Sequence, residues 1–190
     1  RELLDRGADR LDRELVGEPE IQAALQDEIG RVYASLGLFT ESATLLESSL
    51  HTRQAILGHD HPDVAQAMDA LGDVRRELGD FAEAEELSSQ ALRVHQAKHG
   101  ESSAEVARTT GALAVLYTDL GRFDEAEAAY RRAMETWRDL GRESEHATAL
   151  ANLAQLLHEG DDFETPLPLF TEALEIQRRI ARWNAGPLAV

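Results

Sequence analysis

Hydrophobic residues recur every three or four positions along most of the chain, which is the spacing of one face of an α-helix. In the stretch from 29 to 36, Ile29, Val32, Tyr33 and Leu36 share such a face, and Gly37 follows as a helix-ending glycine. The residues that fill these segments are mainly Ala, Leu, Glu and Arg, which are good helix formers. The pattern therefore predicts a succession of helices joined by short turns.

The pattern also repeats over a longer distance. The segment "IGRVYASLGLFTESATLLESSL" at 29–50 returns at 71–92 and 113–134, each time 42 residues later, and a fourth copy at 153–174 follows after 40. Each copy reads as two helices. The shared positions are a glycine (Gly37, Gly79, Gly121), an aromatic residue (Phe39, Phe81, Phe123, Phe163) and a small residue (Ser49, Ala91, Ala133, Ala173). We expect the small residues where helices approach closely, and the whole stripe in the core.

These residues resemble the tetratricopeptide repeat. The 42-residue period, with "LGHDHPDVA" between units, is similar to the variant of kinesin light chains. The opening "RELLDRGADRLDREL" followed by "GRVYASLGLF" is similar to the repeat region attached to bacterial serine/threonine protein kinases. The chain begins without Met, which suggests a fragment of a longer protein.

The resemblance implies an all-α fold, a right-handed α-solenoid of tandem helix-turn-helix repeats. We expect one repeat domain over 1–190, built as a leading capping helix at 1–18, repeats at 19–61, 62–102, 103–142 and 143–183, and a tail at 184–190. In the fourth copy Pro166 and Pro168 are compatible with a helix only within its first turn.

Composition narrows the function classes. The formal net charge of −17 argues against nucleic acid and an anionic membrane surface, and permits a basic partner. Without cysteine, the chain has no disulfide framework or thiolate metal site. No apolar run reaches the length of a membrane span, and no signal peptide is visible.

Two groups of histidines are candidate sites. "HDHPD" at 59–63 packs two histidines and two aspartates together, but the equivalent positions one repeat later are Ser102 to Glu105, so we interpret it as a helix entry. His95 and His99 share a helix face, and we expect both to face solvent. No phosphate loop, nucleophile elbow or catalytic constellation appears. We predict no enzyme activity, no metal and no cofactor.

The family resemblance implies a concave groove lined by the first helix of each repeat. The residues expected to line it are Asp27, Arg31, Gln66, Asp69, Asp73, Arg76, Arg108, Thr118, Asn152, Gln155 and His158. This mixed, slightly acidic set suits an extended peptide with polar and basic side chains. The clamp that some family members use for chaperone C-termini is not expected, because Asp27, Ala70 and Ala112 stand where it needs other side chains.

The last helix carries two apolar stripes. We expect Phe163, Leu167, Phe170 and Leu174 to face its partner helix, and Leu169, Ala173, Ile176, Ile180 and Trp183 to be exposed. The exposed stripe would make a self-association surface, formed by Leu169, Ile176, Ile180 and Trp183. The alternatives are that the tail "NAGPLAV" folds over it, or that the array continues beyond the fragment.

The function expected is a non-catalytic protein–protein interaction scaffold or regulatory module that binds a peptide or protein segment in its groove. The alternative is a structural element that dimerises a larger bacterial signalling protein, such as a kinase. The compartment is the cytoplasm by default, or the far side of the membrane if the domain belongs to a membrane-anchored kinase.

Overall fold

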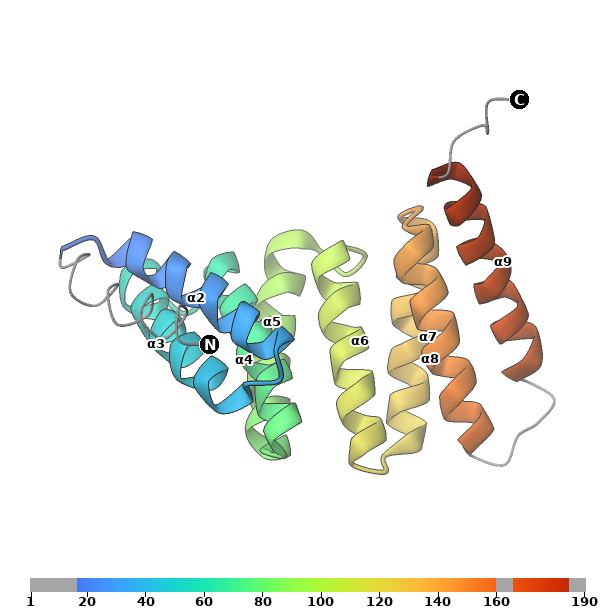
Figure 1. Ribbon diagram of the computed structural model, residues 1–190, viewed down its shortest axis with the longest axis horizontal. Helices are drawn as coiled ribbons and strands as arrows, with labels where there is room; N and C mark the ends of the chain where they lie inside the picture. The colour runs from blue at the N-terminus through green and yellow to red at the C-terminus, as the bar shows by residue number, and fades with distance from the viewer. Residues whose placement is uncertain (1–16, 160–165, 185–190) are drawn as a thin grey trace. The chain divides into compact units, whose positions relative to one another are not determined.

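The computed structural model describes residues 17–159 and 166–184, and all regular structure within them is helical (Figure 1). The helices are α2 (Pro19–Ser35), α3 (Phe39–Leu57), α4 (Pro62–Leu78), α5 (Phe81–His99), α6 (Ala104–Asp119), α7 (Phe123–Asp139), α8 (Glu143–Glu159) and α9 (Pro166–Asn184). The all-α fold of tandem helix pairs is thus confirmed. The leading helix predicted at 1–18 lies almost entirely outside the described residues, as does Phe163.

The described residues fall into two compact units, one up to Lys98 and one from His99. The single repeat domain with the boundaries given above stays a prediction. The first unit holds the helix pairs α2/α3 and α4/α5, and the second holds α6/α7 and α8/α9. Within the second unit α6 packs on α7, α7 on α8 and α8 on α9, so helices that follow one another in the chain are also neighbours in space. Figure 1 shows α6 on one side of this unit and α9 on the other. None of the described helices is both long and apolar enough to cross a membrane.

Capping side chains, prolines and glycines determine where the helices begin and end. "HDHPD" is a helix entry, as predicted: Nδ1 of His61 accepts a 3.1 Å hydrogen bond from the N–H of Asp63, and Pro62 occupies the first turn. Ser103 caps α6 in the equivalent place by accepting from the N–H of Val106. Gly79 ends α4 at φ 85°, a left-handed conformation that glycine adopts without a steric penalty. Pro166 begins α9, so both of its prolines fall in the first turn.

Small residues bring the paired helices of the first unit into close contact. Ser49 lies fully buried and donates a 2.7 Å hydrogen bond to the carbonyl of Ala23 on the neighbouring helix α2. Ser42 donates in the same way to the carbonyl of Gly30. A Cβ atom on Gly30 would lie 2.9 Å from Cγ of Leu46, so the helices touch backbone to side chain at this point. The prediction that the small-residue stripe belongs to the core is confirmed, since Ala91, Ala133 and Ala173 are also buried.

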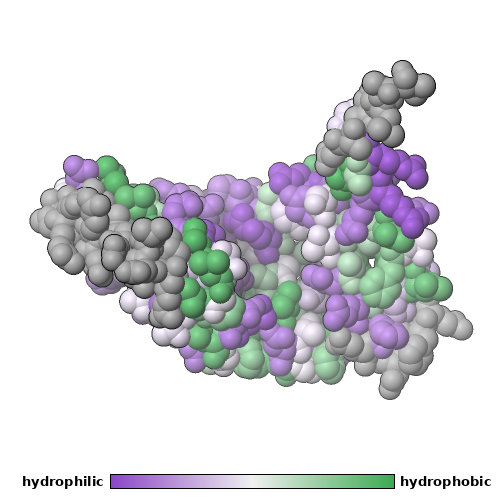
Figure 2. Space-filling view, in the orientation of Figure 1, coloured by the Kyte–Doolittle hydropathy of each residue, from purple (hydrophilic) through white to green (hydrophobic). Residues whose placement is uncertain are grey.

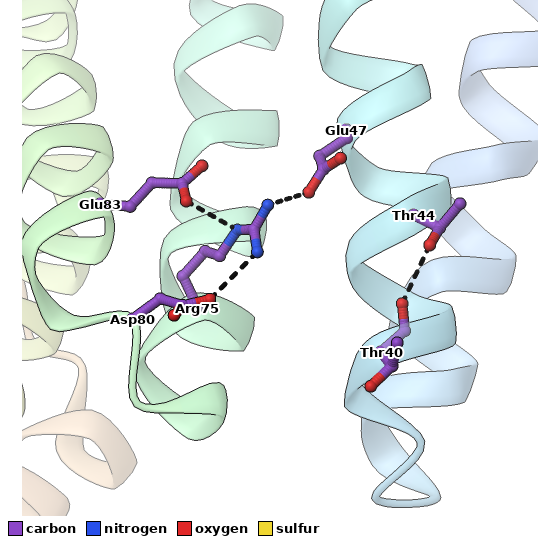
Figure 3. A network of polar contacts seen from close by, with 6 residues as sticks. All are labelled: Thr40, Thr44, Glu47, Arg75, Asp80 and Glu83. Atoms are coloured by element: carbon purple, nitrogen blue, oxygen red, sulfur yellow. Dashed lines mark hydrogen bonds and ion pairs between the residues drawn. The ribbon is translucent and has the colours of Figure 1, made fainter.

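One arginine connects three carboxylates around the middle of the first unit. Arg75 on α4 contacts Glu47 on α3, Asp80 in the turn after α4, with 3.1 Å between Nη1 and Oδ2, and Glu83 on α5, with 3.2 Å between Nε and Oε2 (Figure 3). Thr44, also drawn there, donates to the carbonyl of Thr40 within α3. Because Arg75 is mostly buried, these contacts satisfy its charge and join α3, α4 and α5.

The sequence analysis predicted which apolar stripe of α9 faces its partner helix and which is exposed, and this prediction is wrong. Ala173 and Ile176 are buried against Ala147 and Leu150 of α8, and Leu169 and Ile180 pack beside them. The stripe expected to face the partner helix is exposed instead, at Leu167, Phe170 and Leu174. The self-association surface predicted at Leu169, Ile176 and Ile180 therefore does not exist as proposed, and of its four residues Trp183 alone stands fully in solvent.

Candidate functional site

The predicted groove residues of the first unit fall into two groups. Asp27 is buried, and its Oδ2 lies 2.8 Å from Nε of Arg31 one turn later on α2. Since the carboxylate of Asp27 has little contact with solvent, it orients Arg31 and is not itself a surface for a ligand. Gln66 and Asp73 on α4 are exposed, whereas Arg76 is half-buried and contacts Glu77.

Asp69 belongs to an interaction that the sequence interpretation missed. Its Oδ2 lies 2.9 Å from Nε2 of His95, which comes from α5 and is only 1% exposed. The prediction that His95 faces solvent is wrong, because the pair joins α4 to α5 in the interior of the unit. His99, one turn later, is exposed as expected. Among the described residues no three His, Asp or Glu side chains are placed to hold a metal ion.

The second unit contains an apolar pocket between the first helices of its two repeats. The pocket has a volume of about 280 Å³ and lies between α6 and α8, with α7 behind it. Tyr130, Ala133 and Trp137 of α7 form its floor, and Val115 and Ala149 line its walls. The predicted groove residues Arg108 and Asn152 lie at its edge, together with Ser144 and Thr148. The site therefore offers an apolar hollow with polar groups around the opening.

Gly111 on α6 creates the space. At the equivalent positions of the earlier repeats stand Asp27 and Asp69, which contact Arg31 and His95 respectively. A Cβ atom on Gly111 would meet only Cβ of Ala133, at 3.9 Å, which is an ordinary contact distance. Helix packing therefore does not require glycine here, in contrast to Gly30. A glycine in the middle of a helix costs about 1 kcal/mol relative to alanine. Gly111 lines the pocket, where a longer side chain would take up part of the space.

A second hollow of about 220 Å³ continues along the same two helices. It shares Val115, Tyr130 and Asn152 with the apolar pocket, so the two form one groove. Its lining adds the predicted residues Thr118 and Gln155, and also Asp119. His158, the remaining predicted residue, is exposed on α8 but lines neither hollow. The structure thus brings together Arg108, Thr118, Asn152 and Gln155 of the predicted set.

An ion pair between Arg142 and Glu145 keeps a carboxylate ionised at the end of the groove where α8 begins. Nε of Arg142 donates a 3.0 Å hydrogen bond to Oε1 of Glu145, which lines the apolar pocket. This hydrogen bond lowers the pKa of the Glu145 carboxyl and raises that of Arg142. Arg122 lowers the pKa of Glu125 by the same contact at the start of α7. Both carboxylates therefore stay ionised to a lower pH than an isolated glutamate does.

The floor of the pocket was not predicted from the sequence, because Tyr130 and Trp137 lie on the second helix of their repeat, and the groove was expected from the first helices alone. They are indeed buried, and each also borders the pocket. The signal that would have located the pocket is the break at Gly111 in a position that is Asp in two other repeats.

With the groove defined, the chain can be compared with known proteins. Two models of the tetratricopeptide repeat match it, one over residues 21–97 and 105–179 and the other over 70–139. The chain belongs to the tetratricopeptide repeat family. Repeats of this family are protein–protein interaction scaffolds and are generally non-catalytic. No protein of curated function matches the chain.

Solved structures with similar folds include kinesin-light-chain-like repeats. BtubC (BKLC) from P. vanneervenii matches with a TM-score of 0.78 and 21% identity over 91% of this chain and 70% of its own. A protein described as a kinesin light chain from Podosopora anserina, with nearly identical TPR-like repeats, matches with a TM-score of 0.70 and 20% sequence identity. This match covers 94% of the present chain and 89% of that protein. The resemblance to kinesin light chains is confirmed at the level of the fold, while the link to bacterial kinases stays a prediction.

A third structure of similar fold was solved with a peptide. The Rap conjugation gene regulator of the plasmid pLS20, in complex with the Phr* peptide, has a TM-score of 0.71 and 17% identity. The match covers 82% of this chain and 42% of that protein. At these identities the likeness shows the fold and nothing more specific.

Proposed function

We propose that the groove between α6 and α8 binds an extended segment of a partner protein, as the interaction site of a non-catalytic scaffold. The observation that carries the proposal is the apolar pocket opened by Gly111, with Tyr130 and Trp137 as its floor. A protein bears the cost of an interior helical glycine where the space is needed, and no contact of the helices needs it here. The tetratricopeptide family membership and the peptide complex of the Rap regulator support the same reading.

The pocket favours a particular kind of segment. Its walls are apolar and its volume of about 280 Å³ suits one large aliphatic or aromatic side chain. Amide and hydroxyl groups of Asn152, Thr148 and Ser144 border it, and these can hydrogen-bond the backbone of an extended chain. To the expected extended peptide with polar and basic side chains, the pocket adds an apolar anchor residue.

Selection from a library of random 12-residue peptides displayed on phage tests this function, with the 190-residue chain as bait. Binding is then followed by tryptophan fluorescence in a Trp183→Phe background. Trp183 is exposed and Trp137 borders the pocket, so this variant retains one tryptophan as reporter. We expect enriched peptides that share an apolar residue and change the Trp137 emission. Failure to enrich any peptide, or enriched peptides that leave the Trp137 emission unchanged, would contradict the proposal.

A further inference from the structure

Helices at the two ends of the described chain leave apolar faces uncovered, and the internal repeats show what covers such faces elsewhere. On α9 the exposed face consists of Phe170 and Leu174, 40% and 46% exposed, with Leu167 beside them. Figure 2 shows hydrophobic surface over part of α9, the helix at the right of Figure 1. On α2 the exposed face includes Leu25 and Val32, 39% and 42% exposed.

The repeat alignment identifies the α9 face as one half of an interface that occurs within each unit. Phe170 is equivalent to Leu46 on α3 and Tyr130 on α7, which are 1% and 5% exposed. Leu46 is buried in one cluster with Leu71 and Val74 of the following helix α4, and Tyr130 in one cluster with Leu153 and Leu156 of α8. The second helix of a repeat therefore packs this position against the first helix of the next repeat, and also against the first helix of its own, as Leu46 does at Gly30 of α2 and Tyr130 at Ala114 of α6.

The α2 face is the other half of the same interface. Leu71 and Val74 of α4 correspond to Leu153 and Leu156 of α8, and to Ile29 and Val32 of α2. In α4 and α8 these residues are buried against the preceding helix, whereas Val32 of α2 is exposed. One end of the chain thus presents the surface that the other end is shaped to receive.

We infer that two copies of this chain associate head to tail, with α9 of one copy packed on α2 of the next as α7 packs on α8. The occupant is a second copy because α2 carries the apolar pattern that this interface uses. In α4, α8 and α2 alike, Leu or Ile is followed three residues later by Val or Leu, and on α2 the second of these residues, Val32, is exposed. The contact is heterologous, since each partner contributes a different face. It therefore adds copies one after another, in an open array or a closed ring, unless one of the faces is blocked.

Blocked variants test the inference by analytical ultracentrifugation. Phe170→Glu with Leu174→Glu removes the α9 face, and Leu25→Glu with Val32→Glu removes the α2 face. All four positions are exposed, so both variants should retain the helical circular dichroism of the wild type. We expect the wild type to grow in mass with concentration, each variant alone to stay at 21.0 kDa, and their equimolar mixture to double this mass and stop.

Several outcomes overturn the inference. A monomeric wild type, or a mixture that stays monomeric, would show that α2 and α9 do not pair, as when the chain's own first residues cover α2. A dimer formed by the α2-blocked variant alone would indicate α9 packing on α9.

If a glutamate variant fails to fold, single-cysteine variants replace it, because the chain has no cysteine of its own. A short bismaleimide should then link Phe170→Cys to Val32→Cys and should link neither variant to itself.

Discussion

Nε2 of His95 lies 2.9 Å from Oδ2 of Asp69, and the pair connects α5 to α4 inside the first unit. Neither residue marks a ligand site by this contact, although Asp69 was expected to line the groove. A buried hydrogen bond to a carboxylate constrains how two helices pack, because removing either partner leaves the other with a desolvated polar group. The pair is therefore a structural link.

Replacing His95 should destabilise the protein. We expect His95→Ala to lower the free energy of unfolding by about 1–3 kcal/mol, through the lost hydrogen bond and the cavity left behind. Urea denaturation followed by circular dichroism measures this. His51→Ala, at an exposed position on α3, is the matched control and should change stability by less than about 0.5 kcal/mol. Equal effects of the two substitutions would show that the Asp69–His95 pair does not stabilise the fold.

Two glycine-to-alanine substitutions should act in opposite directions. Gly111→Ala should stabilise the protein by roughly 0.5–1 kcal/mol, because helix propensity improves and the new Cβ has room. Gly30→Ala should destabilise it by about 1–3 kcal/mol, because the new Cβ would lie 2.9 Å from Cγ of Leu46. Thermal melts of both variants provide the test. If Gly111→Ala also lowers the melting temperature, packing rather than the pocket explains the glycine.

The ion pairs Arg122–Glu125 at the start of α7 and Arg142–Glu145 at the start of α8 predict that each glutamate depends on its own arginine for its lowered pKa. Arg142→Gln should raise the pKa of Glu145 toward its ordinary value, and Arg122→Gln should do the same for Glu125. Because folding lowers these pKa values, each pair's contribution to stability is present above the ordinary carboxyl pKa and is lost as the pH falls through the lowered one. Carboxyl ¹³C NMR measures each value. Each arginine variant is the control for the other, and a change at the distant glutamate would contradict the assignment.

The sequence predicted the helix pairs because the same core positions recur in each copy of the repeat, so each copy supports the assignment made for the others. It did not locate His95 correctly, since its partner Asp69 lies 26 residues earlier on another helix and no local pattern links them. The two stripes of α9 are each at helical spacing, so spacing alone did not distinguish them. The equivalence of Ala173 to the buried Ala133 did contain the answer, because that small residue marks the face that packs on the partner helix.

The groove was predicted as a row of polar side chains, whereas the proposed binding site centres on an apolar pocket within it. Arg108, Thr118, Asn152 and Gln155 border the groove as expected from the first helices of the repeats. The pocket itself depends on how the side chains of Tyr130 and Trp137 fill the region behind Gly111, and a repeat pattern does not report the volume left between helices. Position 111 differs from the equivalent Asp27 and Asp69 of the earlier repeats, and Gly111 lines the pocket of the proposed site.

Filling the pocket is the most direct test of the proposed function. The affinity of a selected peptide should be measured by fluorescence titration for the wild type, Gly111→Leu and the control Ala128→Leu, which adds the same side chain at an exposed position on α7. Burying one large apolar side chain contributes about 1.5–3 kcal/mol, so Gly111→Leu should weaken binding by at least about tenfold while Ala128→Leu leaves it unchanged. Equal affinities for all three proteins would contradict the account, because the peptide would then bind outside the pocket.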